Sequence, residues 1–336
     1  MTRSGVSYFG SRILRHVRAD MADIRCRGFD AVLHTFTEND LRHYPGQMGA
    51  IVDTSHRLGL HVVMAPWGVG GMFGGEAESR FVGENPAACQ RMADGSPLPG
   101  ACPNDGRTRA LITRWIDAAA DAGADGVFWD EPHWLDPKVC GFEDGGETCF
   151  CHACAEGFAA AYGQPLEPGT PHLPEFRDAS LVDVLTMATA HAAERGLENT
   201  VCVVPPEQAA GGIRDWEKVA AITDLSVLAT DPYWALVSED VAPYVERYSR
   251  KIVELAGRYG LRPQIWILGF GLGPHDAADI ETAVQVARDA GADDIWVWGY
   301  EACGHMDFMN TAEPEAVWEV LTAAVVGRTK GATPDE

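Results

Sequence analysis

Short runs of β-branched and aromatic residues alternate along the chain with longer stretches that carry apolar residues at helical spacing. Runs of the first kind, bounded by glycine, proline or polar residues, predict β-strands. The predicted strands cover residues 5–10, 29–36, 61–67, 125–130, 200–204, 225–230, 264–268 and 294–298. Several helical stretches end at a glycine shortly before a strand, as a helix C-cap does, namely at Gly123, Gly196, Gly260 and Gly291.

Eight strand–helix units, closed by a last helix over residues 313–326, predict a (β/α)8 TIM barrel that forms a single domain over residues 1–336. A doubly wound open sheet is the alternative fold. Two connections are longer than ordinary loops, residues 68–107 after the third strand and residues 132–174 after the fourth. Both follow the carboxyl ends of strands, so we expect both insertions on the face where barrel enzymes carry their active sites.

The first insertion opens with a glycine-rich run over residues 68–76. This run lacks the Lys-Ser/Thr pair that a phosphate-binding loop needs. We therefore expect it to form a flexible wall or lid over a pocket.

A formal net charge of −23 over 336 residues limits the partners of the protein. Nucleic acids and anionic membranes require clustered Lys and Arg, so we expect neither as a partner. No run of about 18 apolar residues is present. The first residues also carry no basic segment followed by an apolar one. These features predict a cytoplasmic protein that acts on a neutral or cationic small molecule.

Three cysteines, Cys149, Cys151 and Cys154, fall within six residues of the second insertion. In a reducing compartment this spacing indicates metal ligands, and zinc commonly takes four cysteines in a structural site. The fourth ligand must come from elsewhere, either from Cys102 or from Cys140. A closed four-cysteine site has no open coordination position, so the zinc would join the two insertions without taking part in catalysis.

The fourth predicted strand ends in Asp130-Glu131-Pro132-His133-Trp134. Adjacent carboxylates at the C-terminal end of a barrel strand are typical of a catalytic site. Three further carboxylates follow other strands, Glu207, Asp231 and Glu301, and each could instead bind a substrate hydroxyl. Glycoside cleavage uses two carboxyl groups, and these strand ends supply several. We therefore predict a glycosidase whose carbohydrate substrate is a small glycoside or oligosaccharide.

The cysteine segment resembles a known family. Residues 149–158, running on to Tyr162-Gly163, resemble the zinc segment of glycoside hydrolase family 42 β-galactosidases. In that family the fourth ligand lies in an upstream Cys-Pro-Asn segment shortly after strand three. Cys102-Pro103-Asn104 matches that segment, so the resemblance implies Cys102 as the fourth ligand. Related family 42 enzymes often assemble, and the resemblance is therefore compatible with a homo-oligomer.

The resemblance extends in part to the catalytic residues. In the clan of family 42, strand four ends in Asn-Glu and the Glu is the acid/base. Glu131 falls on that position, with Asp130 in place of the Asn. The clan's nucleophile, a Glu at the end of strand seven, has no counterpart in residues 268–273.

Two pairings of carboxylates therefore stay open. In the first, Glu131 is the acid and Glu301 is the nucleophile or base. In the second, Asp130 is the nucleophile and Asp231 is the acid/base, an arrangement that resembles retaining α-galactosidase and α-glucosidase barrels with Asp at strands four and six.

Side chains at the strand ends are candidates for sugar binding, because sugar rings stack on aromatic faces and histidines bind hydroxyls. The aromatic candidates are Trp67, Trp134, Tyr233, Trp234 and Trp298, and the histidines near strand ends are His34, His133, His275 and His305. Trp129 and Trp296 lie inside predicted strands, so we expect both in the core.

Two other functions fit the same residues. Glu131, Asp231, Glu301 and a histidine could bind Mg²⁺ or Mn²⁺ in a sugar isomerase or epimerase. The missing carboxylate at strand seven would also suit a barrel that binds carbohydrate without cleaving it.

Overall fold

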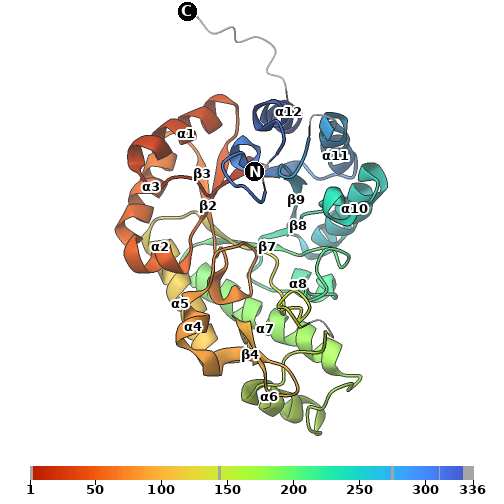
Figure 1. The fold of residues 1–336 in the computed structure, drawn as a ribbon. Helices are drawn as coiled ribbons and strands as arrows, with labels where there is room; N and C mark the ends of the chain where they lie inside the picture. The colour runs from red at the N-terminus through yellow and green to blue at the C-terminus, as the bar shows by residue number, and fades with distance from the viewer. Residues whose placement is uncertain (1–2, 143–144, 274–275, 310, 328–336) are drawn as a thin grey trace, which may run out of the picture. The chain divides into compact units, whose positions relative to one another are not determined.

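The computed structural model describes residues 3–142, 145–273, 276–309 and 311–327. Eight parallel strands form a closed barrel in the order β1-β10-β9-β8-β7-β6-β3-β2 (Figure 1). The barrel strands are β1 (Ser4–Tyr8), β2 (Ala31–Thr35), β3 (His61–Ala65), β6 (Gly126–Trp129), β7 (Glu198–Cys202), β8 (Val227–Thr230), β9 (Arg262–Leu268) and β10 (Asp294–Trp298). The predicted TIM barrel is confirmed, and each predicted strand overlaps an observed one.

The register of β1 explains a glycine in the barrel. Gly5 lies opposite Trp296 of β10 on one side and opposite Ala31 of β2 on the other. A Cβ built on Gly5 would stand 2.4 Å from the Trp296 ring. Only glycine therefore lets this buried indole lie flat against the strand.

Helices follow the strands, as the alternating pattern predicts. They are α1 (Leu14–Cys26), α2 (Glu38–His43), α3 (Pro45–Arg57), α5 (Gly106–Asp121), α7 (Leu173–Glu194), α8 (Trp216–Ala220), α9 (Trp234–Val237), α10 (Val241–Tyr259), α11 (Ala277–Asp289) and α12 (Pro314–Val326). Figure 1 shows α10, α11 and α12 side by side, and α10 packs against β8 and β9. Among the described residues, no helix is both long and apolar enough to cross a membrane.

The structure confirms that helices end at the glycines predicted to follow them. Gly123 after α5 and Gly260 after α10 have φ of 86° and 70°, the left-handed conformation of a C-cap. The buried residues of α10 recur at three- and four-residue spacing, from Tyr244 through Tyr248 and Ile252 to Leu255. This apolar stripe is what holds the helix on the barrel.

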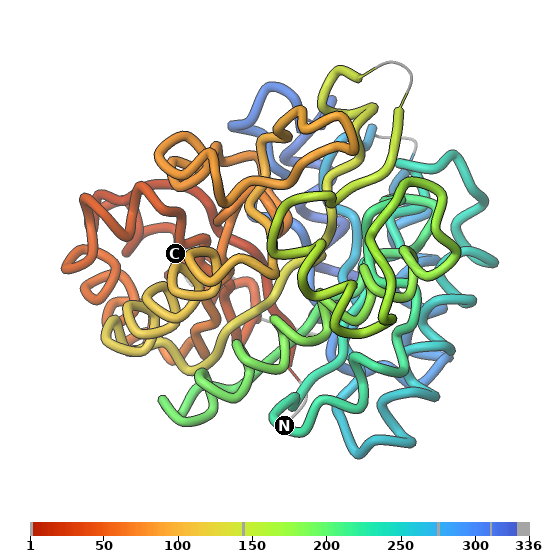
Figure 2. Tube along the Cα trace, turned by 90° about the horizontal axis from the view of Figure 1, so that it is seen from below, coloured from red at the N-terminus to blue at the C-terminus, as the bar shows by residue number. Residues whose placement is uncertain are grey.

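Both insertions contain structure of their own. The first carries the short helices η1 (Val69–Gly71), α4 (Arg80–Glu84) and η2 (Pro86–Ala88), followed by an antiparallel hairpin of β4 (Cys89–Arg91) and β5 (Pro97–Ala101). The second carries α6 (His152–Tyr162). Met92 of the first insertion bridges to Thr148 of the second, and Figure 2 traces the two segments side by side in orange and yellow-green.

By their internal contacts the residues group into two compact units. The first unit comprises residues 1–34, 50–63 and 227–336, and the second comprises residues 35–49 and 64–226. Both insertions, Asp130 and Glu131 belong to the second unit, whereas Asp231 and Glu301 belong to the first.

Candidate functional site

Asp130 and Glu131 directly follow β6, all of whose residues are buried. The end of this strand is fixed by Trp129, whose indole N–H donates to Oδ1 of Asn199 on β7 over 3.1 Å. Trp129 has no exposed surface, and Trp296 has 2%, so both lie in the core as expected. The next two side chains, Asp130 and Glu131, are partly exposed. The structure thus places two carboxylates at the C-terminal end of a barrel strand.

The glycine-rich run 68–76 forms a packed wall against Asp130. The N–H of Gly74 donates to the Asp130 carbonyl over 2.9 Å, and the N–H of Gly68 donates to the Gly74 carbonyl over 3.0 Å. Three side chains of the wall are at most 2% exposed, those of Val69, Met72 and Phe73. The expectation of a flexible lid is therefore wrong here, because burial and backbone hydrogen bonds hold the run in place.

A buried carboxylate anchors this wall from α2. Glu38 Oε1 accepts hydrogen bonds from the N–H of Gly70 at 2.9 Å and from the Ser79 hydroxyl at 2.6 Å. Its Oε2 accepts from the N–H of Phe81 at 2.7 Å. Both carboxylate oxygens therefore accept hydrogen bonds from the first insertion, and the role of Glu38 is structural.

The surroundings of Asp130 favour its protonated form. Burial raises the pKa of this carboxyl well above its usual range, and the nearby carboxylates of Glu131 and Glu76 raise it further. Among the described residues, no side chain or backbone N–H donates a hydrogen bond to the Asp130 carboxyl. A carboxyl group without donors and beside two other acids holds its proton more readily than an ordinary aspartate does.

Glu76 is a member of this cluster that the sequence did not reveal. It lies in the wall, two residues after Gly74, and its side chain is exposed. Partial desolvation raises its pKa, and the Glu131 carboxylate raises it further. The sequence analysis did not select Glu76 because it lies in a glycine-rich loop and not at the end of a strand. Its charge in an otherwise uncharged run is the one sequence signal that could have identified it.

The turn that carries Glu131 is unusual in its backbone. Glu131 has φ of 39°, a left-handed conformation that residues with side chains rarely adopt. His133 Nδ1 lies 2.6 Å from the Glu131 carbonyl and must carry the proton, because a carbonyl oxygen only accepts. The His133 N–H donates to the Met72 carbonyl over 3.0 Å. Backbone of this kind concentrates at functional sites.

The other candidate carboxylates lie after different strands. Glu207, in the second unit, is exposed beyond β7. In the first unit, Asp231 is 3% exposed, whereas Glu301 is exposed and has φ of 50°. Glu301 lines a cavity of about 670 Å³ together with Arg27 and Trp318. The two pairings, Glu131 with Glu301 and Asp130 with Asp231, each join residues of different units and stay predictions.

Most of the aromatic candidates expose little of their rings. Trp67, Trp134, Tyr233, Trp234 and Trp298 are between 1% and 7% exposed. Stacking requires an open ring face, so this burial favours a packing role for these rings.

The histidine candidates differ in their surroundings. His34 is fully buried and pairs with the Ser55 hydroxyl over 3.0 Å. Burial lowers its pKa from 6.5 to about 3, so it is neutral at physiological pH. His305 is exposed, with its ring 5.3 Å from that of Phe9. His275 lies outside the described residues.

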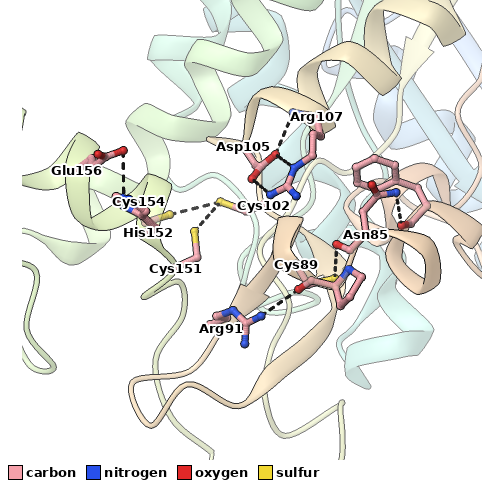
Figure 3. A network of polar contacts seen from close by, with 12 residues as sticks. Asn85, Cys89, Arg91, Cys102, Asp105, Arg107, Cys151, His152, Cys154 and Glu156 are labelled. Atoms are coloured by element: carbon pink, nitrogen blue, oxygen red, sulfur yellow. Dashed lines mark hydrogen bonds and ion pairs between the residues drawn. The ribbon is translucent and has the colours of Figure 1, made fainter.

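Four buried cysteines come together in the second unit: Cys102, Cys149, Cys151 and Cys154. All four sulfurs lie within 4.8 Å of one another. Figure 3 shows Cys102, at the end of the hairpin, turned toward Cys151 and Cys154 at the start of α6. Cys140 is not part of the group, so the structure selects Cys102, as the resemblance implied.

The geometry of this cysteine cluster fits a tetrahedral metal ion. The sulfur of Cys102 lies 3.4 Å from that of Cys154 and 3.5 Å from that of Cys151. A zinc ion with bonds of about 2.3 Å to sulfur spaces its ligands about 3.8 Å apart. The backbone N–H of Arg91 donates to the sulfur of Cys149 over 3.4 Å, and the side-chain amide of Asn104 donates to the sulfur of Cys154 over the same distance. Such donors are the outer contacts that stabilise thiolate ligands.

His152 lies between two of these cysteines in sequence but not in the cluster. Its side chain is 84% exposed and faces Glu156, with 3.6 Å between Nδ1 and Oε2 (Figure 3). The four sulfurs therefore form the whole donor set among the described residues of this cluster.

Comparisons with solved structures agree with the fold. The catalytic domain of β-amylase from Paenibacillus polymyxa matches with a TM-score of 0.67 at 11% identity, over 96% of this chain and 98% of that one. A catalytic mutant of a GH42 β-galactosidase from G. stearothermophilus matches with a TM-score of 0.65 at 12% identity, over 96% of this chain and 56% of that one. A D-psicose 3-epimerase matches with a TM-score of 0.53 at 10% identity, over 97% of this chain and 99% of that one. The similar structures thus include both glycoside hydrolases and sugar epimerases, and at these identities the likeness shows the barrel fold alone. No protein-family model matches the sequence, and no curated protein is significantly similar to it.

Proposed function

We propose that the protein is a glycoside hydrolase in which Asp130 supplies the proton and Glu131 supplies the reacting carboxylate. The observation that carries this proposal is the cluster of Asp130, Glu131 and Glu76 at the end of β6, where burial and two neighbouring acids raise the pKa of Asp130. Glycoside cleavage requires one carboxyl group that donates a proton and a second that acts as nucleophile or base, and the raised pKa of Asp130 favours the first role for Asp130. The similar barrels, mostly glycoside hydrolases, support this reaction class at the level of the fold.

The chemistry follows from the order in which the two groups hold protons. Asp130 transfers its proton to the glycosidic oxygen, so the leaving sugar departs as an alcohol. In one course Glu131 attacks the anomeric carbon, and water then hydrolyses the glycosyl-enzyme while the Asp130 carboxylate takes a proton from that water. In the other course Glu131 itself takes a proton from the water that attacks the anomeric carbon. The Asp130 carboxylate that remains lies beside Glu131 and Glu76, whose charges favour its reprotonation for the next turnover.

This assignment differs from the one that the family resemblance implied, in which Glu131 is the acid/base. The difference rests on environment, because burial acts on Asp130 as the largest cause of its raised pKa. Asp130 also packs directly against the wall, with the Gly74 N–H on its carbonyl.

The four cysteines would hold a structural Zn²⁺ that joins the β4–β5 hairpin to α6. Their burial, their mutual distances and their four thiol donors fit a closed zinc site. Bound there, the ion would stabilise the two insertions and supply no chemistry to the reaction.

A sugar epimerase is the second candidate, since D-psicose 3-epimerase shares the barrel. This candidate rests on the shared fold, because the described residues bring no set of three carboxylate or histidine ligands close enough to hold one Mg²⁺ or Mn²⁺ ion. Such an enzyme would need added metal for turnover of a free sugar, whereas the proposed hydrolase would not.

A panel of α- and β-nitrophenyl glycosides tests the proposal. The wild type is compared with Asp130→Asn, Glu131→Gln and, as a control on the exposed face of α6, Glu156→Gln. We expect release of nitrophenol from at least one glycoside, a loss of about 10³-fold in either active-site variant, and no change in the control. Turnover of free ketoses only with Mg²⁺ or Mn²⁺ would establish the epimerase instead. Sugar binding without any turnover would leave the protein a binding barrel.

A further inference from the structure

A second pocket adjoins the loop that carries Asp130 and Glu131. It has a volume of about 230 Å³ and is lined in part by Trp134, Arg177, Gly211 and Arg214, all in the second unit. Its wall is continuous with the catalytic turn, because the Trp134 N–H donates to the Gly211 carbonyl over 2.9 Å.

Close packing requires a glycine at position 211, in the lining of this pocket. A Cβ built on Gly211 would stand 1.7 Å from the Trp134 carbonyl oxygen. The neighbouring Gly212 pairs with His133 as an isolated β-bridge. The pocket is therefore built directly onto the turn that follows Glu131, only a few residues from the proposed reacting groups.

Two arginines face this pocket without a carboxylate partner. The Arg177 guanidinium lies 5.8 Å from the centre of the Trp134 ring, which covers one of its faces. Among the described residues, no carboxylate forms an ion pair or a hydrogen bond with the guanidinium of Arg177 or of Arg214. Burial lowers the pKa of Arg177, and the positive charge of Arg214 lowers it further, while the nearby carboxylates Asp178, Glu147 and Asp136 act in the opposite direction without outweighing the burial. Arg177 is partly buried and Arg214 is exposed, and their like charges repel each other at the edge of the pocket.

Two acidic residues also line the pocket, Asp178 and Glu147, and both accept hydrogen bonds from backbone N–H groups. Asp178 is buried and accepts hydrogen bonds from the backbone N–H groups of Arg214 and Asp215, at 3.2 and 3.0 Å to its Oδ2. Glu147 accepts from the N–H of Gly169 at 2.8 Å. These carboxylates position the loops of the pocket and leave the arginine N–H groups available to a ligand.

We propose that this pocket binds the anionic group of the substrate, so that the enzyme acts on an acidic saccharide that carries a carboxylate or phosphate. This inference rests on the proposed glycosidase function. A single guanidinium group binds an oxyanion through two parallel hydrogen bonds, and a partly buried cation such as Arg177 is stabilised by such a partner. With a net charge of −23, the protein as a whole repels an acidic sugar, so local arginines are needed to hold one. This proposal differs from the neutral or cationic substrate that we expect from the sequence, and the binding experiment below distinguishes the two.

Calorimetric titration of the full-length protein tests the pocket without requiring turnover. The ligands are glucuronate, galacturonate, glucose 6-phosphate, inorganic phosphate and neutral glucose. The variants are Arg177→Gln, Arg177→Lys and Arg214→Gln. Arg250→Gln serves as a control, because Arg250 pairs with Glu246 on the exposed face of α10. Thermal unfolding identifies any variant that has lost its fold, and Arg177→Lys keeps the charge where Arg177→Gln does not.

We expect an acidic sugar to bind at least tenfold more tightly than glucose, and either glutamine variant to remove that preference while Arg250→Gln keeps it. A preference for uronates identifies a carboxylate ligand, and a preference for glucose 6-phosphate identifies a phosphate. Equal affinity for acidic and neutral sugars, or full affinity in folded Arg177→Gln and Arg214→Gln, would overturn the inference. Turnover of nitrophenyl glycosides separates the two claims. If neutral glycosides are cleaved at the same rate in wild type, Arg177→Gln and Arg214→Gln, only the proposed role of the pocket is contradicted. Arginine-dependent binding without any glycoside cleavage contradicts only the hydrolase.

Discussion

The Cα of Gly74 lies directly against the carboxyl group of Asp130. A Cβ built on Gly74 would stand 2.7 Å from Asp130 Oδ2, closer than real Cβ atoms approach. The Gly74 N–H also donates to the Asp130 carbonyl over 2.9 Å, so the wall cannot move away without breaking a hydrogen bond. The Asp130 carboxyl group can therefore occupy its position only because residue 74 has no side chain.

Replacing this glycine should damage activity more than stability. In Gly74→Ala the added methyl group displaces the Asp130 carboxyl, and a shift of about 1 Å at a reacting group costs about 10²-fold in rate. We expect kcat/KM to fall by about that factor while the free energy of unfolding falls by only about 1–3 kcal/mol. Gly83→Ala is the matched control, since a Cβ there meets nothing within 4 Å. Equal activity of the two variants would show that the Asp130 position is not critical.

Asp130→Asn should stabilise the protein while it removes activity. The folded-state pKa of Asp130 is raised above its unfolded value by burial, Glu131 and Glu76. A raised acid pKa contributes stability at low pH and loses it as the pH rises through the folded pKa. The neutral amide avoids that loss, so the variant should unfold at a higher urea concentration than wild type at pH 8, with a smaller gap at pH 5. A lower stability of the variant at pH 8 would mean that Asp130 is ionised and well solvated.

Glu76→Gln should change the pH dependence of the reaction. Glu76 raises the pKa of Asp130, so removing its charge lowers that pKa. Because the proposed acid works in its protonated form, the basic limb of the kcat/KM profile should move to lower pH. Glu78→Gln, in the same exposed loop, serves as the control. An unmoved basic limb in Glu76→Gln would separate Glu76 from the catalytic cluster.

The features that could be predicted from sequence are those that depend on local pattern. The strands, the glycine C-caps and the carboxylates after β6 follow from residue type and spacing. The β4–β5 hairpin was missed because its second strand, Pro97–Ala101, contains two prolines and a glycine, which weaken any strand signal.

The features that sequence missed depend on long-range contacts. The glycine-rich run looked flexible, yet Glu38 of a distant helix anchors it. Arg177 lies in α7, where no sequence motif marks it, and only the tertiary structure brings its guanidinium group over the Trp134 ring. Helical periodicity cannot distinguish such an arginine from a solvated one.

The cysteine cluster predicts one bound zinc ion per chain. Because structural zinc contributes directly to folding, Cys102→Ser should remove the ion and lower the melting temperature by several degrees. Cys140→Ser should keep both, since Cys140 lies outside the cluster. Elemental analysis and thermal unfolding measure the two effects. Metal-free wild-type protein with unchanged stability would contradict the zinc assignment.

His34 should make the fold sensitive to acid. Its pKa is lowered from 6.5 to about 3 in the folded state, because the ring is buried between Tyr8 and Ser55. The unfolded chain takes up a proton below about pH 6.5 that the folded protein does not, so stability falls as the pH drops. At about 1.4 kcal/mol per pH unit, this amounts to about 2 kcal/mol between pH 6.5 and pH 5.

His34→Gln should lack this increment, although the change lowers stability at neutral pH. The measurement is the free energy of urea unfolding at pH 7 and pH 5 for wild type, His34→Gln and His152→Gln, whose histidine is exposed. We expect the loss between the two pH values to be about 2 kcal/mol smaller in His34→Gln than in the other two proteins. The same loss in all three would mean that His34 becomes protonated within the folded barrel, which its burial against Ser55 and Tyr8 opposes.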